Sequence, residues 1–323
     1  MRVKKIVALA LACVTLVAAF SGCGKKDDTV YKIGICQLVQ HEALDAATKG
    51  FQDALTEKLG ERVQFDLKNA SGDAPTCGTI VNQFVADKVD LIMANATASL
   101  QSAFAATADI PIVATSITDY ATALDIDNWT GKTGVNVTGT CDLAPLDEQA
   151  AMIKELFPDA KKVGILYCSA EANSKYQAVK ITEYLTALGI ESEEFTCSDT
   201  NDIAMVTSAA CAASDVIYIP TDNMMAHSTG IVDGVAGPAG VPIVAGEAGI
   251  CGGCGVATLS IDYYSIGYEA GVQAYEILEN DANPADMEIG YAKDLTKQYV
   301  AERCTKLNVT IPDSYTAMTI AEE

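Results

Sequence analysis

The sequence predicts an α/β protein of two doubly wound parallel-sheet lobes joined by a hinge. Three observations support this fold class. Short apolar runs typical of buried strands alternate with longer segments of helical periodicity. The alternation occurs in two series, separated at 125–140 by turn-forming residues. The chain has 323 residues, of which 50 % are hydrophobic, and this suffices for two cores of ordinary domain size.

The first series lies before the turn-forming segment. Its first helix has Leu44, Phe51 and Leu55 at helical spacing, and Gly60 ends the pattern. The predicted strands of this series are 30–38, 62–70, 89–96 and 110–116. The predicted helices are 41–60, 76–88 and 97–108.

The second series follows the same rule. Its predicted strands are 161–169, 190–197, 215–220, 241–247 and 255–262. Its predicted helices are 146–157, 174–188, 202–213, 223–236 and 264–280. A single eight-fold barrel of about 250 residues would also fit the length, but it does not explain the break at 125–140. Two lobes are therefore favoured.

The first 22 residues are expected to be a signal peptide. A basic start precedes an apolar run at 6–20, which is short for a membrane-spanning helix, and small residues stand directly before Cys23. This pattern resembles a bacterial lipobox, in which the cysteine becomes the lipidated N-terminus. Residues 23–29 would then form a tether. An ordinary secretory leader with a chance cysteine is the alternative.

The charge balance restricts the partners. The chain carries 21 Lys+Arg against 43 Asp+Glu, a formal net charge of −22. Nucleic acid and anionic lipid headgroups are poor partners for such a chain, because binding them needs a basic patch.

The cysteines are expected to be free or structural. The chain has 11, and nine remain without Cys13 of the leader and the lipidated Cys23. An odd number cannot all pair, and so many thiols in an exported protein indicate an anaerobic bacterial source. Cys251 and Cys254 form one CxxC motif with no second pair and no neighbouring histidine, so we expect them to be structural, with no bound zinc.

Candidate ligand-binding residues follow from the rule that open parallel sheets bind ligands at the carboxyl ends of their strands. Hydroxyls, amides and carboxylates dominate there, without Lys or Arg. The candidates are Gln37, Leu38, His41, Thr97, Ser99, Thr115, Thr118, Asp119, Tyr120, Glu171, Asn173, Ser174, Thr221, Asp222, Asn223, Glu247, Asp262 and Tyr263.

Five of these candidates are acids, which suits a ligand with an ammonium group. The acids are Asp119, Glu171, Asp222, Glu247 and Asp262. A ligand carboxylate would depend on backbone N–H groups at the helix starts 97–99 and 173–175. Leu38, His41, Tyr120 and Tyr263 would supply apolar and ring surface.

Each candidate also has a simpler explanation. Thr97, Asn173, Thr221, Asp222 and Asp262 stand where helix N-caps belong, and a cap alone accounts for such residues. The histidine and the two tyrosines could be surface residues. The chain has no GxSxG, GxGxxG, P-loop or HExxH motif. We therefore expect a binding protein with no catalytic residue, metal or cofactor.

Several segments in order resemble one family of solute-binding lipoproteins of ABC transporters. These segments are "IGICQLVQHEALD", "LKNASGD", "NATASLQSA", "PIVATSITD", "NVTGTCD", "ILYCSAEANS", "IPTDN" and "IDYYSIGYEAG", between Lys32 and Pro312. The resembled group has the type I periplasmic-binding fold and is associated with tryptophan and tyrosine uptake.

The resemblance implies two lobes, 30–138 plus 263–290 and 139–262 plus 291–323, joined by three crossovers and closing on ligand by a hinge motion. It implies capture of Trp, Tyr or Phe by a monomer at the outer face of the cytoplasmic membrane. ABC permease subunits with a cytoplasmic ATPase would receive the ligand. The alternatives are a receptor subunit for signalling or chemotaxis, an importer component for another amine-bearing solute, and an enzyme acting on a small amine.

Overall fold

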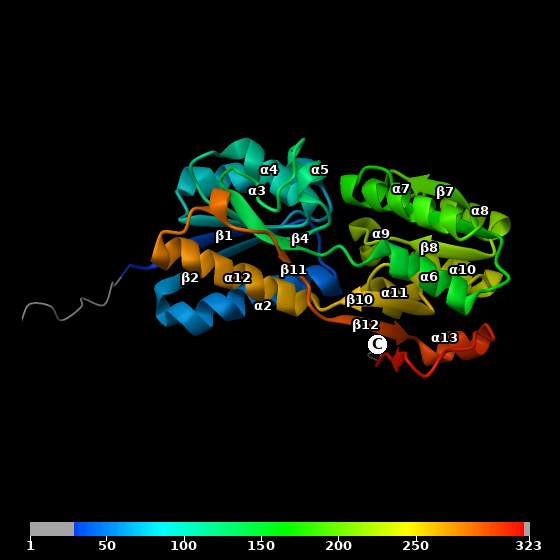
Figure 1. Cartoon of the computed structure of the whole chain (residues 1–323). Coiled ribbons are helices and arrows are strands. Elements are labelled where there is room, and N and C mark those ends of the chain that lie inside the picture. The colour runs from blue at the N-terminus through cyan, green and yellow to red at the C-terminus, as the bar shows by residue number, and fades with distance from the viewer. Residues whose placement is uncertain (1–28, 320–323) are drawn as a thin grey trace, which may run out of the picture. The chain divides into compact units, whose positions relative to one another are not determined.

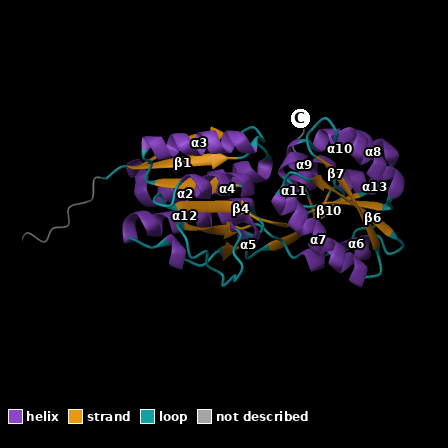
Figure 2. Ribbon diagram, turned by 90° about the horizontal axis from the view of Figure 1, so that it is seen from above, coloured by secondary structure: helices purple, strands orange, loops and turns teal. Residues whose placement is uncertain are grey.

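Two β-sheets with helices on their faces organise residues 29–319, the part of the chain that the computed structural model describes (Figures 1 and 2). The predicted signal peptide, Cys23 and most of the tether lie outside the described residues. Within the described part, no helix combines the length and apolar character needed to cross a membrane.

The first sheet has six strands in the order β11-β5-β4-β3-β1-β2, and all its pairings are parallel. Its strands are β1 (Tyr31–Gln37), β2 (Val63–Asn69), β3 (Leu91–Asn95), β4 (Ile112–Ile117), β5 (Val137–Cys141) and β11 (Gly290–Tyr291). Its helices are α2 (Glu42–Leu59), α3 (Ala74–Asp87), α4 (Thr97–Ala106), α5 (Tyr120–Leu124) and α12 (Tyr263–Asn280), with the short 3₁₀ turns η1 (Gly60–Arg62) and η2 (Pro284–Asp286).

Each face of this sheet has its own core. Phe51 and Leu55 of α2 pack with Ala270 and Ala274 of α12 on one face, and these two helices lie side by side in Figure 1. Phe84 of α3 belongs to the core on the other face, together with residues of α4. The alternation of strand side chains thus sends β1 residues to both cores, as expected for a parallel sheet covered on both faces.

The second sheet has seven strands in the order β13-β12-β10-β9-β8-β6-β7. All pairs are parallel except β10 with β12. Its strands are β6 (Lys162–Cys168), β7 (Glu191–Cys197), β8 (Val216–Ile219), β9 (Ile243–Ala245), β10 (Ala257–Ile261), β12 (Leu295–Tyr299) and β13 (Thr316–Ala317). Its helices are α6 (Leu146–Leu156), α7 (Ala172–Ala187), α8 (Ile203–Ala213), α9 (Asn223–His227), α10 (Thr229–Ala239), α11 (Ala248–Cys254) and α13 (Ala301–Lys306).

The predicted fold class of two α/β lobes is confirmed. The chain passes from the first sheet to the second after β5, returns between β10 and α12, and passes again between β11 and β12. β5 pairs with β4 along its length, so the predicted boundary at 138 would cut a strand, and the first passage comes after Cys141. The other lobe boundaries stay a prediction.

The predicted helix 223–236 is two helices, because Ser228 (φ −118°, ψ 21°) leaves helical geometry between α9 and α10. One non-helical residue such as Ser228 leaves the apolar periodicity almost unchanged, so the pattern does not show the break. The short helices α5 and α11 also escaped prediction, since one or two turns are too short to display a period.

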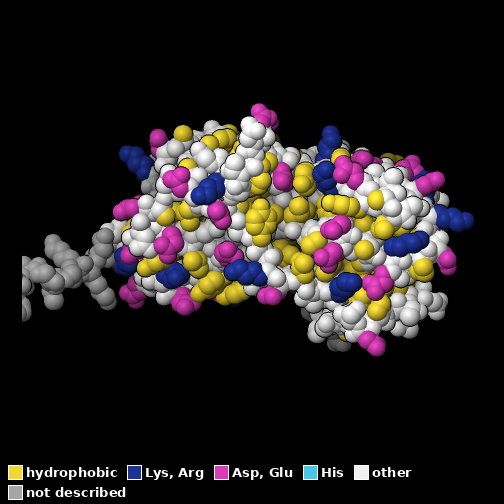
Figure 3. Space-filling view, viewed as in Figure 1, with side chains coloured by type: hydrophobic (Ala, Val, Ile, Leu, Met, Phe, Trp, Pro, Cys, Tyr) yellow, Lys and Arg dark blue, Asp and Glu magenta, His cyan; other side chains and the backbone are white. Residues whose placement is uncertain are grey.

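Acidic and basic side chains are interspersed on the face seen in Figure 3, and basic residues do not cluster there.

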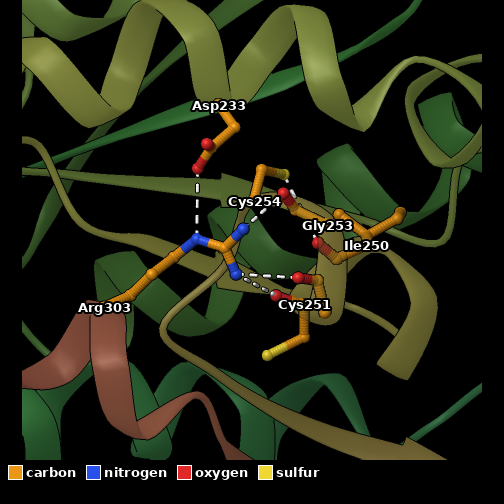
Figure 4. A network of polar contacts seen from close by, with 7 residues as sticks. Asp233, Ile250, Cys251, Gly253, Cys254 and Arg303 are labelled. Atoms are coloured by element: carbon orange, nitrogen blue, oxygen red, sulfur yellow. Dashed lines mark hydrogen bonds and ion pairs between the residues drawn. The ribbon is translucent and has the colours of Figure 1, made fainter. Parts of the chain in front are cut away.

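The CxxC motif lies in α11, which Arg303 caps from α13 (Figure 4). The guanidinium donates to the carbonyl oxygens of Gly252 (2.7 Å) and Gly253 (2.6 Å) and pairs with Asp233 (3.1 Å). Both cysteines are buried, and burial raises the pKa of each thiol. Among the described residues, no group of three His, Cys, Asp or Glu could hold a metal ion. A structural role for the pair stays a prediction, which elemental analysis finding one zinc per chain would contradict.

Arg303→Met should lower the free energy of unfolding by about 2 kcal/mol, since charged hydrogen bonds to otherwise unpaired helix carbonyls are lost. Urea unfolding measures this. Lys180→Met is the matched control, because the Lys180–Glu183 pair is exposed and contributes little. Equal losses for the two variants would contradict a capping role for Arg303.

Candidate ligand-binding site

Two cavities are lined by residues that follow strands of both sheets. The small cavity measures about 10 Å³ and the large one about 470 Å³. Asn173 and Asn223 line both, so the cavities adjoin. The small cavity is lined by His41, Leu44, Ser116, Thr118, Asp142, Asn173, Thr221, Asp222, Asn223, Ala226, Glu247 and Tyr263.

Polar contacts connect the two lobes beside these cavities. His41 Nε2 lies 3.2 Å from Asn223 Oδ1, and His227 Nδ1 lies 3.0 Å from the Gln40 carbonyl oxygen. The Asn223 amide nitrogen donates to Glu171 (2.6 Å), so its oxygen faces the histidine and accepts from His41. Burial lowers the pKa of His41, which makes this ring neutral at pH 7. The ring therefore adds no positive charge to the small cavity.

Asp142 is a buried acid in the small cavity, directly after β5. Its carboxylate accepts hydrogen bonds from Thr118 Oγ1 (3.2 Å) and from the Tyr263 hydroxyl (3.0 Å). Burial raises its pKa to about 6, against the lowering effect of the two hydroxyls. Among the described residues, no positively charged group pairs with this acid.

Asp222 and Glu247 are also buried acids in the small cavity, and both cap helices. Asp222 accepts from the N–H groups of Met225 (2.8 Å) and Cys168 (2.7 Å). Glu247 accepts from Gly249 (2.6 Å) and from Ile250 N–H. Burial raises the pKa of both to about 7, assisted at Asp222 by the nearby charge of Glu171. Three carboxyls therefore line one small cavity, where a bound cationic group would interact favourably with them.

Ser116 completes the wall of the small cavity at the end of β4. Its backbone is left-handed (φ +57°), which is uncommon for a non-glycine residue. Its hydroxyl is buried and has no hydrogen-bond partner among the described residues. Strained residues with unused polar atoms cluster at functional sites.

The large cavity receives the first turns of α4 and α7. Neither helix has a side-chain cap at its N-cap residue, Ala96 or Glu171, whereas α3 and α9 at the same cavity are capped by Asp73 and Asp222. The α4 and α7 N–H groups therefore point their partial positive charge toward the cavity. None of the described residues lining either cavity is Lys or Arg.

The structure brings most of the predicted residues together. The small cavity takes His41, Thr118, Asn173, Thr221, Asp222, Asn223, Glu247 and Tyr263. The large cavity takes Leu38, Thr97 and Glu171, with Asn173 and Asn223 again. The candidates that line neither cavity are Gln37, Ser99, Thr115, Asp119, Tyr120, Ser174 and Asp262.

Most of these remaining side chains have partners within the fold. Gln37 accepts from Thr48 (2.7 Å), and Thr115 accepts from Thr140 (2.9 Å). Ser99 lies between two buried thiols. Ser174 supports the small cavity indirectly, since its hydrogen bond to Asp222 lowers the pKa of that acid.

Asp119 and Asp262 act as helix caps and line neither of these two cavities. Asp119 accepts from Thr122 N–H (2.7 Å) at the start of α5. Asp262 is exposed and accepts from Tyr264 N–H (3.0 Å) at the start of α12. Asp262 lines a different cavity of about 300 Å³ with Glu247.

Tyr120, expected as a wall of the site or a surface aromatic, is buried in the first lobe. Its hydroxyl donates to the carbonyl oxygens of Ala114 (3.0 Å) and Thr140 (3.2 Å). Its ring stacks on Trp129 with centroids 6.3 Å apart. These contacts pair the hydroxyl and bury the ring, and Tyr120 lines neither cavity.

Sequence reasoning did not select Asp142 and Ser116. Asp142 comes directly after a strand, so the strand-end rule finds it once β5 is assigned to the first sheet. Ser116 stands beside two selected residues, but only the structure reveals its unpartnered hydroxyl.

Comparison with known proteins gives a family match and close relatives. The family model described as "ABC transporter substrate binding protein" matches residues 32–321. The chain is 38 % identical over 292 residues to a tyrosine-binding protein of Clostridioides difficile, covering 85 % of this chain and 84 % of that protein.

Two solved structures are similar along most of the chain. An ABC domain from Streptococcus pneumonia in complex with L-Trp is 31 % identical, with a TM-score of 0.86, and covers 90 % of this chain and 100 % of that one. The ligand-free, open structure of a substrate-binding protein with adhesive properties from Clostridium difficile is 35 % identical, with a TM-score of 0.69 and the same coverage.

Proposed function

The chain belongs to the ABC transporter substrate-binding proteins, and we propose that its ligand is a free aromatic amino acid bound between the two lobes. Membership in this family confirms the expectation of a binding protein rather than an enzyme. The tyrosine-binding and L-Trp-bound relatives support tyrosine and tryptophan as the first candidates, with phenylalanine beside them.

The observation that carries the proposal is the small cavity, which holds three buried carboxyls and is lined by no cation among the described residues. An α-ammonium group placed there would supply the positive partner that Asp142, Asp222 and Glu247 share and could donate one hydrogen bond to each. The ligand α-carboxylate would then meet the uncapped N-termini of α4 and α7.

The large cavity suits the remaining side chain. At about 470 Å³ it falls in the usual range for small-molecule sites. Leu38, Val39, Pro75 and Met224 give it apolar surface. An aromatic ring gains the most from such surface.

The cellular setting forms the rest of the proposal. Cys23 would carry the lipid that anchors the mature monomer at the outer face of the cytoplasmic membrane. The protein would hand its ligand to permease subunits driven by a cytoplasmic ATPase. The acid excess of the sequence and the matched family support this setting.

A thermal scan with candidate ligands tests the ligand class. Trp, Tyr or Phe at about 100 times the dissociation constant should stabilise the protein by roughly 2.7 kcal/mol. Ala, Glu, Arg and a sugar should give smaller shifts at the same concentration. Stabilisation by a branched aliphatic amino acid or a dipeptide, with no shift from the aromatics, would refute the proposal.

A further inference from the structure

Among the described residues, Ser116 is the one with a buried, unpaired side-chain polar atom that lines either of the two cavities. The buried side-chain atoms without a partner are Asn95 Oδ1, Ser116 Oγ, Thr207 Oγ1, Ser214 Oγ and Thr258 Oγ1. Of these five residues, only Ser116 lines either cavity described above. A buried hydroxyl that lacks a partner costs free energy, so a ligand that completes its hydrogen bond is favoured.

The size of the small cavity limits what can enter. Its volume of about 10 Å³ corresponds to one group the size of a water molecule. An ammonium group is of this size. A methyl group on the nitrogen would need space that the lining residues Leu44, Ser116 and Ala226 already occupy.

The wall of the small cavity is rich in acceptors. The carboxyls of Asp142, Asp222 and Glu247 can each accept a further hydrogen bond, and the Ser116 hydroxyl can accept one as well. The hydroxyls of Thr118 and Tyr263 are oriented as donors to Asp142 and leave their own oxygens as acceptors. Such a wall can satisfy all three N–H bonds of a primary ammonium.

We infer that Ser116 contacts the ligand nitrogen and, with the narrow cavity, restricts the protein to unsubstituted primary ammonium groups. This inference rests on the proposed function and deepens it. The chain would bind a free amino acid and reject the same molecule when its nitrogen carries a methyl or acyl group, although the aromatic ring and the carboxylate are unchanged.

Titration calorimetry with L-tryptophan and N-methyl-L-tryptophan tests the inference. The wild-type chain should bind the methylated compound about 30-fold or more weakly, because overpacking a rigid wall is unfavourable. Ser116→Gly should weaken tryptophan binding about 10-fold through loss of the hydroxyl. Because it also removes the Cβ atom, it should reduce the ratio of the affinities for tryptophan and N-methyl-L-tryptophan. Glycine adopts φ near +57° without strain, so this variant is expected to fold.

Two further variants distinguish the effect of the Ser116 hydroxyl from the steric effect of its Cβ atom. Ser116→Ala keeps the Cβ atom, so it should lose affinity for tryptophan and keep the rejection of the methylated compound. Thr258→Val removes another buried unpaired hydroxyl, one that lines neither cavity, and should change neither affinity.

Two results would overturn the inference. One is equal wild-type affinity for the two compounds. The other is a Ser116→Gly chain with a changed melting temperature and an unchanged preference, as expected if Ser116 only holds a water molecule or the turn. Failure of the proposed function would differ from both, since no aromatic amino acid would then bind the wild-type chain.

Discussion

Asp142→Asn should weaken the binding of an aromatic amino acid by roughly 30-fold to several-thousand-fold, corresponding to about 2–5 kcal/mol for one partner of a buried charge pair. Asp142 is the most direct test of the small cavity, because it caps no helix. Its side chain accepts hydrogen bonds from the hydroxyls of Thr118 and Tyr263. The asparagine keeps the shape and one acceptor oxygen for one of those hydroxyls, while its NH2 group replaces the oxygen that accepted from the other. Titration calorimetry measures the loss.

Asp119→Asn and Asp262→Asn are the matched controls. Both residues were candidates from the sequence, and both cap helices outside the two cavities. They should reduce stability by about 1 kcal/mol or less and leave the affinity unchanged. Loss of affinity in Asp262→Asn, with normal binding by Asp142→Asn, would move the ammonium site to the cavity of about 300 Å³.

Affinity should also depend steeply on pH. Burial raises the pKa of Asp142 to about 6 and those of Asp222 and Glu247 to about 7 in the empty protein. A cationic group binds the ionised carboxyls, so acidification makes protons compete with the ligand. Each carboxyl contributes up to about tenfold per pH unit below its pKa, and we expect a total loss of roughly 100-fold or more from pH 7 to pH 5.

The stability of the empty protein should change in the opposite direction. A carboxyl with a raised pKa binds its proton more tightly in the folded than in the unfolded chain, between about pH 4 and pH 7. These three groups therefore add stability as the pH falls through that window, while the stabilisation by ligand shrinks. Thermal scans from pH 8 to pH 5 measure both, with Glu247→Gln expected to flatten the two curves. Ligand affinity that is constant over this range would contradict the assigned role of the carboxyls.

Sequence reasoning located the carboxyl ends of the strands but could not rank the acids found there. Asp119, Asp222, Glu247 and Asp262 all precede helices, and all four cap them. Asp222 and Glu247 are buried between segments of both lobes, whereas Asp262 is exposed. Whether such an acid is buried depends on which residues of the other lobe pack against it. The sequence pattern around the acid does not reveal those residues.

Tyr120 and Asp142 illustrate the same limit in the first lobe. The segment 125–140 was interpreted as the break between the two series, but its last residues belong to β5, which returns to the first sheet beside β4. Gly139 permits this return, since a Cβ atom there would lie 1.8 Å from the Ala114 carbonyl oxygen. Once β5 is in place, Tyr120 has backbone acceptors to bind and Asp142 stands at a strand end.

The position of α12 in the chain has a consequence for folding. This helix comes after β6 to β10 of the second sheet in the sequence. Its Ala270 and Ala274 nevertheless complete the core around Phe51 and Leu55 of the first lobe. A chain synthesised only as far as β10 leaves that apolar face of α2 uncovered. The first lobe must therefore wait for residue 280 before it can close its core, while β6 to β10 already hold the strands of their parallel sheet. The second lobe is completed later still, because β12, α13 and β13 follow α12 in the chain, so neither lobe can complete its core from one continuous segment.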